Sequence, residues 1–203
     1  VNEVLAGRAA ELVGSSRGDR KAINPNDDVN LGQSTNDTFP TALHMAAIAV
    51  GRVLAGEVEK LAASLERKGE EFDGIVKSGR THLMDAMPMT VEQELSGWQA
   101  QFDSAMDRLQ DTGKRLLALP LGGTAVGTGV NADPKMTLLA CRILAKNTGL
   151  RIHPAANKFE SMAAQDHLVE LSGQCNALAV TLMKIANDLR WMNSGPLTGL
   201  AEV

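Results

Sequence analysis

The most reactive side chains of this sequence gather in the stretch 78–90, where Arg80, Thr81, His82 and Asp85 lie close together just before a long apolar-periodic segment. Histidine titrates near neutrality, so it can exchange a proton or donate a hydrogen bond to an anion. Thr81 and Arg80 add donors of the kind that a carboxylate needs. The pattern predicts a polar active-site loop, although an Arg-Thr-His tripeptide taken alone is more typical of solvated surface.

A second polar stretch, 15–33, is rich in Ser, Gly, Asn, Asp and Pro. Such residues favour turns, and a structureless loop of about twenty residues in a compact chain is usually functional or flexible. The sequence then enters a helix, for which Asp37 or Thr38 is the expected N-cap and Pro40 lies in the first turn.

The segment 120–131 holds four glycines and two threonines in twelve residues. Glycines allow close approach of the backbone, and successive N–H groups can cradle an anion. The spacing matches neither the Rossmann nor the Walker pattern, so it does not predict a nucleotide site. Two interpretations of this segment are equally supported: a glycine-rich crossover between helices, or the wall of a binding site.

These stretches are separated by segments of helical periodicity. Aromatic residues make up only 3% of the chain and Tyr is absent, which suits a core of closely packed aliphatic helices. We therefore expect an all-α fold, a long-helix bundle, with residues 1–33 as the end of one domain and 34–203 as the bundle domain. The expected helices are 1–13, about 28 residues from position 39, 91–119, 134–148 and 157–193.

The net charge, the cysteine content and the hydropathy of the sequence exclude several classes of function. The formal net charge of -4 and pI of about 5.6 give no basic footprint for nucleic acid or an anionic membrane surface. Cys141 and Cys175 lack metal-ligand spacing, so neither a zinc site nor a disulfide framework is expected, and both are predicted to be buried free thiols. No uninterrupted apolar run of membrane-spanning length and no secretory signal is apparent, so a cytoplasmic protein is expected.

Four motifs follow one another along the chain: GQSTNDTFPTA at 32–42, GRTHLMD at 79–85, GGTAVGTG at 122–129 and ANKFE at 156–160. Together they resemble the fumarase/aspartase superfamily, and most closely its class II fumarate hydratases. The resemblance implies a lyase of the tricarboxylic acid cycle that hydrates fumarate reversibly to malate without a metal or other cofactor. It also implies a homotetramer around a helical bundle, with active sites assembled from three chains.

Carried over by position, the resemblance implies that Ser34, Thr35 and Asn36 bind a substrate carboxylate. It implies that Thr81 and His82 are catalytic, the histidine bonding substrate or a catalytic water. A secondary anion site would map to Asn24, Asn26 and Asp27, but Asn24 stands where the bacterial enzymes have histidine, which puts that site in doubt.

Alternatives stay open at this point. His82 and the ANKFE motif favour a fumarase, whereas residues 85–90 lean towards aspartate ammonia-lyases. The family's Gly-Ser-Ser loop, which carries the catalytic base, is not found within these 203 residues, so the chain on its own is expected to be inactive. A non-catalytic helical fragment that only oligomerises is the third interpretation.

Overall fold

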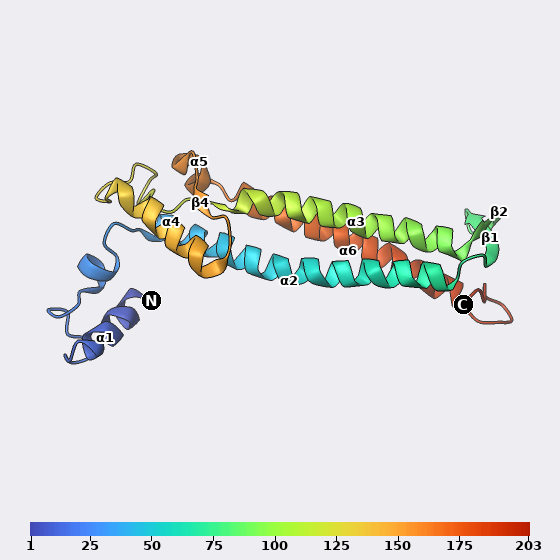
Figure 1. Cartoon of the computed structure of the whole chain (residues 1–203), viewed down its shortest axis with the longest axis horizontal. Helices are drawn as coiled ribbons and strands as arrows, with labels where there is room; N and C mark the ends of the chain where they lie inside the picture. The colour runs from blue at the N-terminus through green and yellow to red at the C-terminus, as the bar shows by residue number, and fades with distance from the viewer. The chain divides into compact units, whose positions relative to one another are not determined.

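The computed structural model describes residues Val1–Val203, and the chain is mostly helical, which confirms the all-α prediction (Figure 1). The helices are α1 (Asn2–Leu12), the π-helical turn η1 (Pro25–Val29), α2 (Thr35–Glu71), α3 (Val91–Leu116), α4 (Pro134–Thr148), α5 (Lys158–Ala163) and α6 (Asp166–Met192). Two small strand pairs complete it: β1 (Val76–Thr81) runs antiparallel to β2 (Met84–Thr90), and β3 (Ala118–Leu119) parallel to β4 (His153–Pro154).

The chain divides into two compact units, each formed by two stretches of sequence. Unit 1 comprises Val1–Ala46 and Leu116–Asp166, and unit 2 comprises Ala47–Arg115 and His167–Val203. Helix α2 supplies its first turns to unit 1 and the remainder to unit 2. The domain boundary expected at residue 33 stays a prediction.

Unit 2 is built on long helices that share one apolar core. The latter part of α2, α3 and α6 run alongside one another, with the β1–β2 hairpin at one end (Figure 1). Phe102 and Trp98 of α3 are 1% and 3% exposed, and they belong to the same cluster as Val58 of α2 and Ile185 of α6. Apolar residues at three- and four-residue steps place these side chains on one face of each helix.

Unit 1 is organised by helix caps and a smaller core. Asp133 accepts a hydrogen bond from the Lys135 amide at 2.8 Å, and α4 ends at Gly149 in the left-handed region. Asn157 caps α5 through the Glu160 amide at 3.1 Å. Short polar side chains satisfy the free amides of a first turn in this way. The core cluster contains Leu119, Leu121, Cys141 and Ile152.

Two helix predictions were wrong in their limits. Helix α2 begins at Thr35 and extends over 37 residues to Glu71, so neither Asp37 nor Thr38 is its N-cap. Residues 157–193 form two helices rather than one, because Ala164 adopts an extended backbone with φ -135° and ψ 155°. Neither Gly nor Pro marks that break in the sequence.

By length and composition alone, α2 could cross a membrane: one window of 18 residues has a mean hydropathy of 1.3, and 22% of that window is buried. This qualifies the expectation drawn from the sequence. However, α2 contributes Val58 and Ala62 to the core of unit 2, and it buries Asp37, Thr41 and His44. We therefore assign α2 as a core helix.

Candidate active site

His82 lies at the tip of the β1–β2 hairpin, not in an irregular loop as predicted. Thr81 pairs with Met84, which leaves His82 and Leu83 as a two-residue turn with φ of 52° and 60°. Turns of this length favour positive φ at both positions, which Asn and Gly adopt readily and Leu does not. The Thr81 and His82 side chains are exposed there, so a strained turn presents both to solvent.

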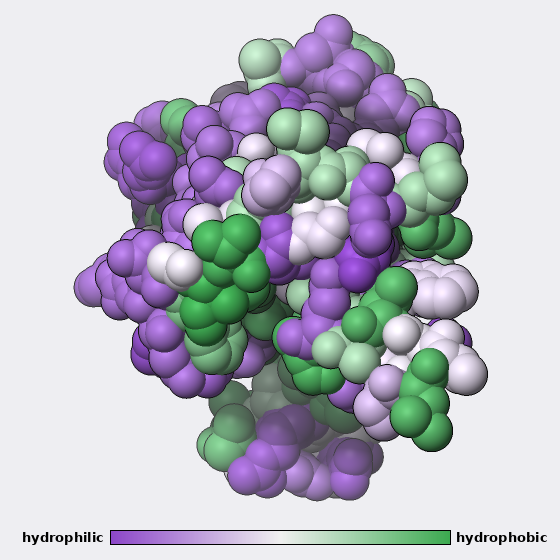
Figure 2. Space-filling view, turned by 90° about the vertical axis from the view of Figure 1, so that its right-hand side faces the viewer, coloured by the Kyte–Doolittle hydropathy of each residue, from purple (hydrophilic) through white to green (hydrophobic).

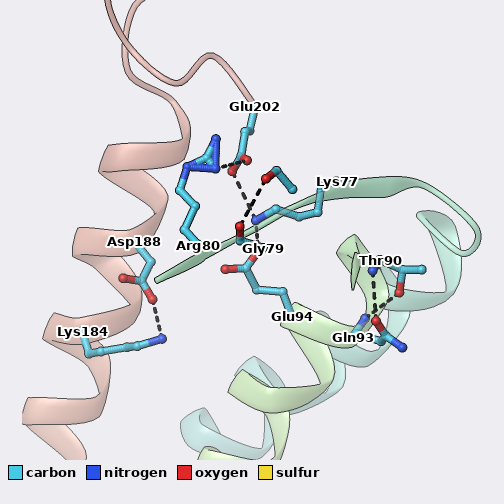
Figure 3. Close-up of polar contacts among 10 residues, drawn as sticks. Lys77, Gly79, Arg80, Thr90, Gln93, Glu94, Lys184, Asp188 and Glu202 are labelled. Atoms are coloured by element: carbon cyan, nitrogen blue, oxygen red, sulfur yellow. Dashed lines mark hydrogen bonds and ion pairs between the residues drawn. The ribbon is translucent and has the colours of Figure 1, made fainter. Parts of the chain in front are cut away.

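A nearly enclosed charge network holds strand β1 of this hairpin through Lys77 and Arg80 (Figure 3). Arg80 donates to Glu202 at 2.8 Å, while Lys77 pairs with Glu202 at 3.2 Å and with Glu94 of α3. The four side chains are only 11–22% exposed. Burial alone would lower the pKa of Lys77, but its hydrogen bonds and charge interactions with the two carboxylates raise it above the usual value. Lys77 therefore stays charged.

A pocket of about 430 Å³ lies beside the network within unit 2. Its lining includes His82 and Arg80 of the hairpin region, Lys184 and Trp191 of α6, and Leu200. The end of the molecule that carries the hairpin shows separate hydrophobic areas among hydrophilic ones (Figure 2). Leu83 and Met87 are 69% and 79% exposed, so the hairpin that carries His82 also presents apolar surface.

Replacing Lys77 with Met should destabilise the hairpin. The change leaves Glu94 without its cation, whereas Glu202 keeps Arg80, and an unpaired, largely buried charge is costly. We expect a loss of about 2 kcal/mol in the free energy of unfolding, measured by denaturant titration of the full-length protein. Lys60→Met is the matched control, because Lys60 is 73% exposed in its pair with Glu57 and should change stability by less than about 0.5 kcal/mol. Equal effects of the two substitutions would contradict this account.

In unit 1, the predicted carboxylate-binding residues form the first turn of α2. Ser34 is the N-cap, and its Oγ accepts from the Asn36 amide at 3.2 Å. Thr35 and Asn36 are exposed, and the Asn36 side chain donates to the Ala125 carbonyl at 2.8 Å. The helix dipole favours an anion at such an N-terminus, and the Ser34 and Thr35 hydroxyls and the Asn36 side-chain amide are donors of the kind that a carboxylate requires.

The glycine-rich segment 120–131 does bind an anion through its amides, but the anion is Asp37. The Gly122 and Thr124 amides each donate to Asp37 Oδ2 at 2.9 Å. A Cβ at Gly122 would overlap Thr137 Oγ1, and one at Gly127 would lie 2.7 Å from the Phe159 ring. The segment is therefore a closely packed connection in unit 1 whose anion site is filled internally.

The residues predicted for a secondary anion site form the self-contained turn η1. Asn24 Oδ1 accepts from the backbone amides of Asn26 at 2.9 Å and Asp27 at 3.3 Å. The backbone amide of Asn24 donates to the Asp28 carboxylate at 2.7 Å. The Asn24 side-chain oxygen thus caps its own turn. Whether this turn holds a ligand stays a prediction.

Other polar residues have structural surroundings. His44 is 2% exposed, and its Nδ1 lies 3.2 Å from the Leu116 carbonyl oxygen. Cys141 is buried, and burial raises the pKa of its thiol. No group of three or more His, Cys, Asp or Glu side chains is placed to hold a metal ion.

The sequence patterns did not identify Lys77, Glu94 and Glu202 as a hairpin anchor. Glu202 lies 122 residues from Arg80, so no local spacing could pair them. The candidate residues fall in two places: Ser34, Thr35 and Asn36 lie together in unit 1, and Thr81 and His82 lie together in unit 2.

Comparison with known proteins gives one family throughout. The profile of the lyase family matches residues 1–203. The class II fumarate hydratase of Xylella fastidiosa (strain 9a5c) is 54% identical over 203 residues, and that of Thermus aquaticus is 50% identical over 204. The crystal structure of the class II fumarase of Schistosoma mansoni superimposes with a TM-score of 0.93 at 40% identity, covering 98% of this chain and 45% of that one.

These alignments include the whole of this chain but only part of each relative. The chain spans 42% of the Xylella enzyme and 44% of the Thermus enzyme. The chain is therefore less than half as long as the curated relatives that it matches.

Proposed function

We propose, because this chain belongs to the lyase family, that the protein of which it is part is a class II fumarate hydratase. The reaction would be the reversible addition of water to fumarate, giving malate. The observation that carries the proposal is the display of Thr81 and His82 at a strained hairpin tip, in a chain that matches the class II fumarate hydratases of Xylella fastidiosa and Thermus aquaticus along its entire length.

The roles of the residues follow from the charge of the substrate. A dicarboxylate needs hydrogen-bond donors at both ends, and the reaction places further negative charge on one carboxylate. The hydroxyls of Ser34 and Thr35 and the amide of Asn36 would hold a carboxylate at the start of α2. His82, assisted by Thr81, would donate to the substrate or orient the attacking water.

Steady-state turnover of fumarate and malate by the purified full-length protein tests the proposal. We expect hydration of fumarate at an enzymatic rate. The absence of turnover above that of heat-inactivated protein would contradict it. Aspartate ammonia-lyase, the alternative drawn from residues 85–90, predicts release of ammonia from aspartate in the same preparation.

The 203-residue chain assayed alone is expected not to hydrate fumarate. Its relatives are more than twice as long, and the motifs of this chain supply groups that bind and orient but no assigned base. The comparison is kcat for this chain against kcat for the full-length protein under the same conditions. Comparable values would show that these residues suffice for the reaction.

The proposal includes the association of this chain with further copies of itself. Helix α6 leaves Val180, Met183, Leu189 and Trp191 between 45% and 60% exposed, although its apolar residues surround the helix. Burial of such side chains favours association, and a homotetramer would cover them. Sedimentation equilibrium of the full-length protein should give four times the subunit mass, whereas a monomer would contradict this part. The cytoplasmic location expected from the sequence belongs to the same proposal.

A further inference from the structure

Asp37 is the one acidic residue whose side chain is wholly enclosed in unit 1, at 0% exposure. Its Oδ1 accepts from the backbone amide of Ser34, the N-cap residue of α2, at 2.9 Å. Its Oδ2 accepts from the amides of Gly122 and Thr124, each at 2.9 Å. One carboxylate therefore joins two segments that are 85 residues apart in the sequence.

The surroundings of Asp37 are shaped for this connection. Gly122 has φ of 84° and lies against Thr137, where a side chain would overlap the threonine hydroxyl. Thr124 has φ of 57° and is 3% exposed, although positive φ is uncommon for threonine. Gly122 and Thr124, both in left-handed conformations, thus direct their backbone amides to the same carboxylate oxygen. The strain at Thr124 persists only where surrounding contacts hold it.

A second connection joins the same two segments. The Asn36 side-chain amide donates to the Ala125 carbonyl at 2.8 Å. An asparagine amide has two N–H groups, so this bond leaves one for a ligand while fixing the plane of the amide. The two neighbours of Asn36 differ in exposure: Thr35 is exposed, and Asp37 is enclosed.

We propose that Asp37 is a positioning residue for carboxylate binding: it holds the turn Ser34–Asn36 in register against the glycine-rich segment so that the donors of the turn converge on one anion. The inference rests on the proposed function for the identity of that anion. Asp37 does not touch the substrate in this account. Its carboxylate accepts hydrogen bonds from three backbone amides, which satisfy the buried charge and fix the turn against the glycine-rich segment.

Asp37→Asn is the sharpest variant, because it keeps the shape and removes one acceptor. All three partners of the Asp37 carboxylate are N–H donors, so the new amide group must turn its own N–H bonds towards at least one of them. In the full-length protein we expect KM for fumarate to rise about tenfold or more, with kcat lowered less than about threefold, as for lost binding contacts.

Two controls separate positioning from stability. Leu119→Ala, at a core position that is 0% exposed, should lower the melting temperature and leave KM unchanged. Asp133→Asn alters an N-cap that accepts a single amide and should leave KM unchanged as well. An unchanged KM in Asp37→Asn would overturn the proposal, as would equal rises in KM for Leu119→Ala and Asp37→Asn.

Amide hydrogen exchange provides a readout that does not depend on activity. Exchange at Ser34, Gly122 and Thr124 should become faster in Asp37→Asn and stay unchanged in Asp133→Asn. If the wild-type protein does not turn over fumarate, the proposed function fails, and exchange still decides whether Asp37 holds this turn. Unchanged exchange at these three amides would overturn the proposal by itself.

Discussion

Replacing His82 with Asn in the full-length protein should lower kcat for fumarate hydration by about 10²- to 10⁴-fold, the range for loss of a positioned acid–base group. Asn is suited to the test because it adopts positive φ readily, and His82 has φ of 52°. The hairpin should therefore keep its turn while losing the imidazole. The measurement is kcat and KM for fumarate at constant pH, together with the sedimentation mass of the protein.

His153→Asn is the matched control for this substitution. His153 is exposed, and its Nδ1 lies 3.2 Å from the Arg151 carbonyl oxygen. The His153→Asn substitution should leave kcat for fumarate hydration unchanged. A His82→Asn protein with wild-type kcat would remove the imidazole from the reaction, whereas one with altered mass would attribute the loss to assembly.

Replacing Phe102 with Ala should give the largest loss of stability among single changes in unit 2. Phe102 is 1% exposed within the cluster that joins α2, α3 and α6. Removing a buried aromatic ring loses its transfer free energy and leaves a cavity, which together amount to about 3–5 kcal/mol. The free energy of unfolding of the full-length protein, measured by denaturant titration, checks this value.

Phe39→Ala provides the comparison for the core substitution. Phe39 is 60% exposed in the first turns of α2, so its truncation should change stability by less than about 1 kcal/mol. Similar losses for Phe39→Ala and Phe102→Ala would mean that α2, α3 and α6 do not share the core described for unit 2.

The helix ends that the sequence predicted are those fixed by local chemistry. Thr90 and Gln93 form a reciprocal capping box at the start of α3, with bonds of 3.0 Å and 3.1 Å, and Asp133, Pro134 and Gly149 delimit α4. Each of these signals acts over three or four residues, so a single stretch of sequence contains the whole interaction. The resemblance to the family, confirmed over residues 1–203, rests on motifs of the same local kind.

The features that were missed depend on long-range partners or on an unusual turn. Asp37 was predicted to cap α2, but its partners at Gly122 and Thr124 draw it inside, and Ser34 takes the cap. The β1–β2 hairpin was predicted as a polar loop, because His82-Leu83 lacks the Asn-Gly signal of a two-residue turn. Propensity alone cannot indicate a conformation that surrounding contacts impose.

The full-length protein is proposed to add water rather than ammonia to fumarate. The most direct measurement supplies the full-length protein with fumarate and ammonium ions in water and identifies the product. The account predicts malate as the product, with its formation lost in His82→Asn. Aspartate as the main product would contradict it.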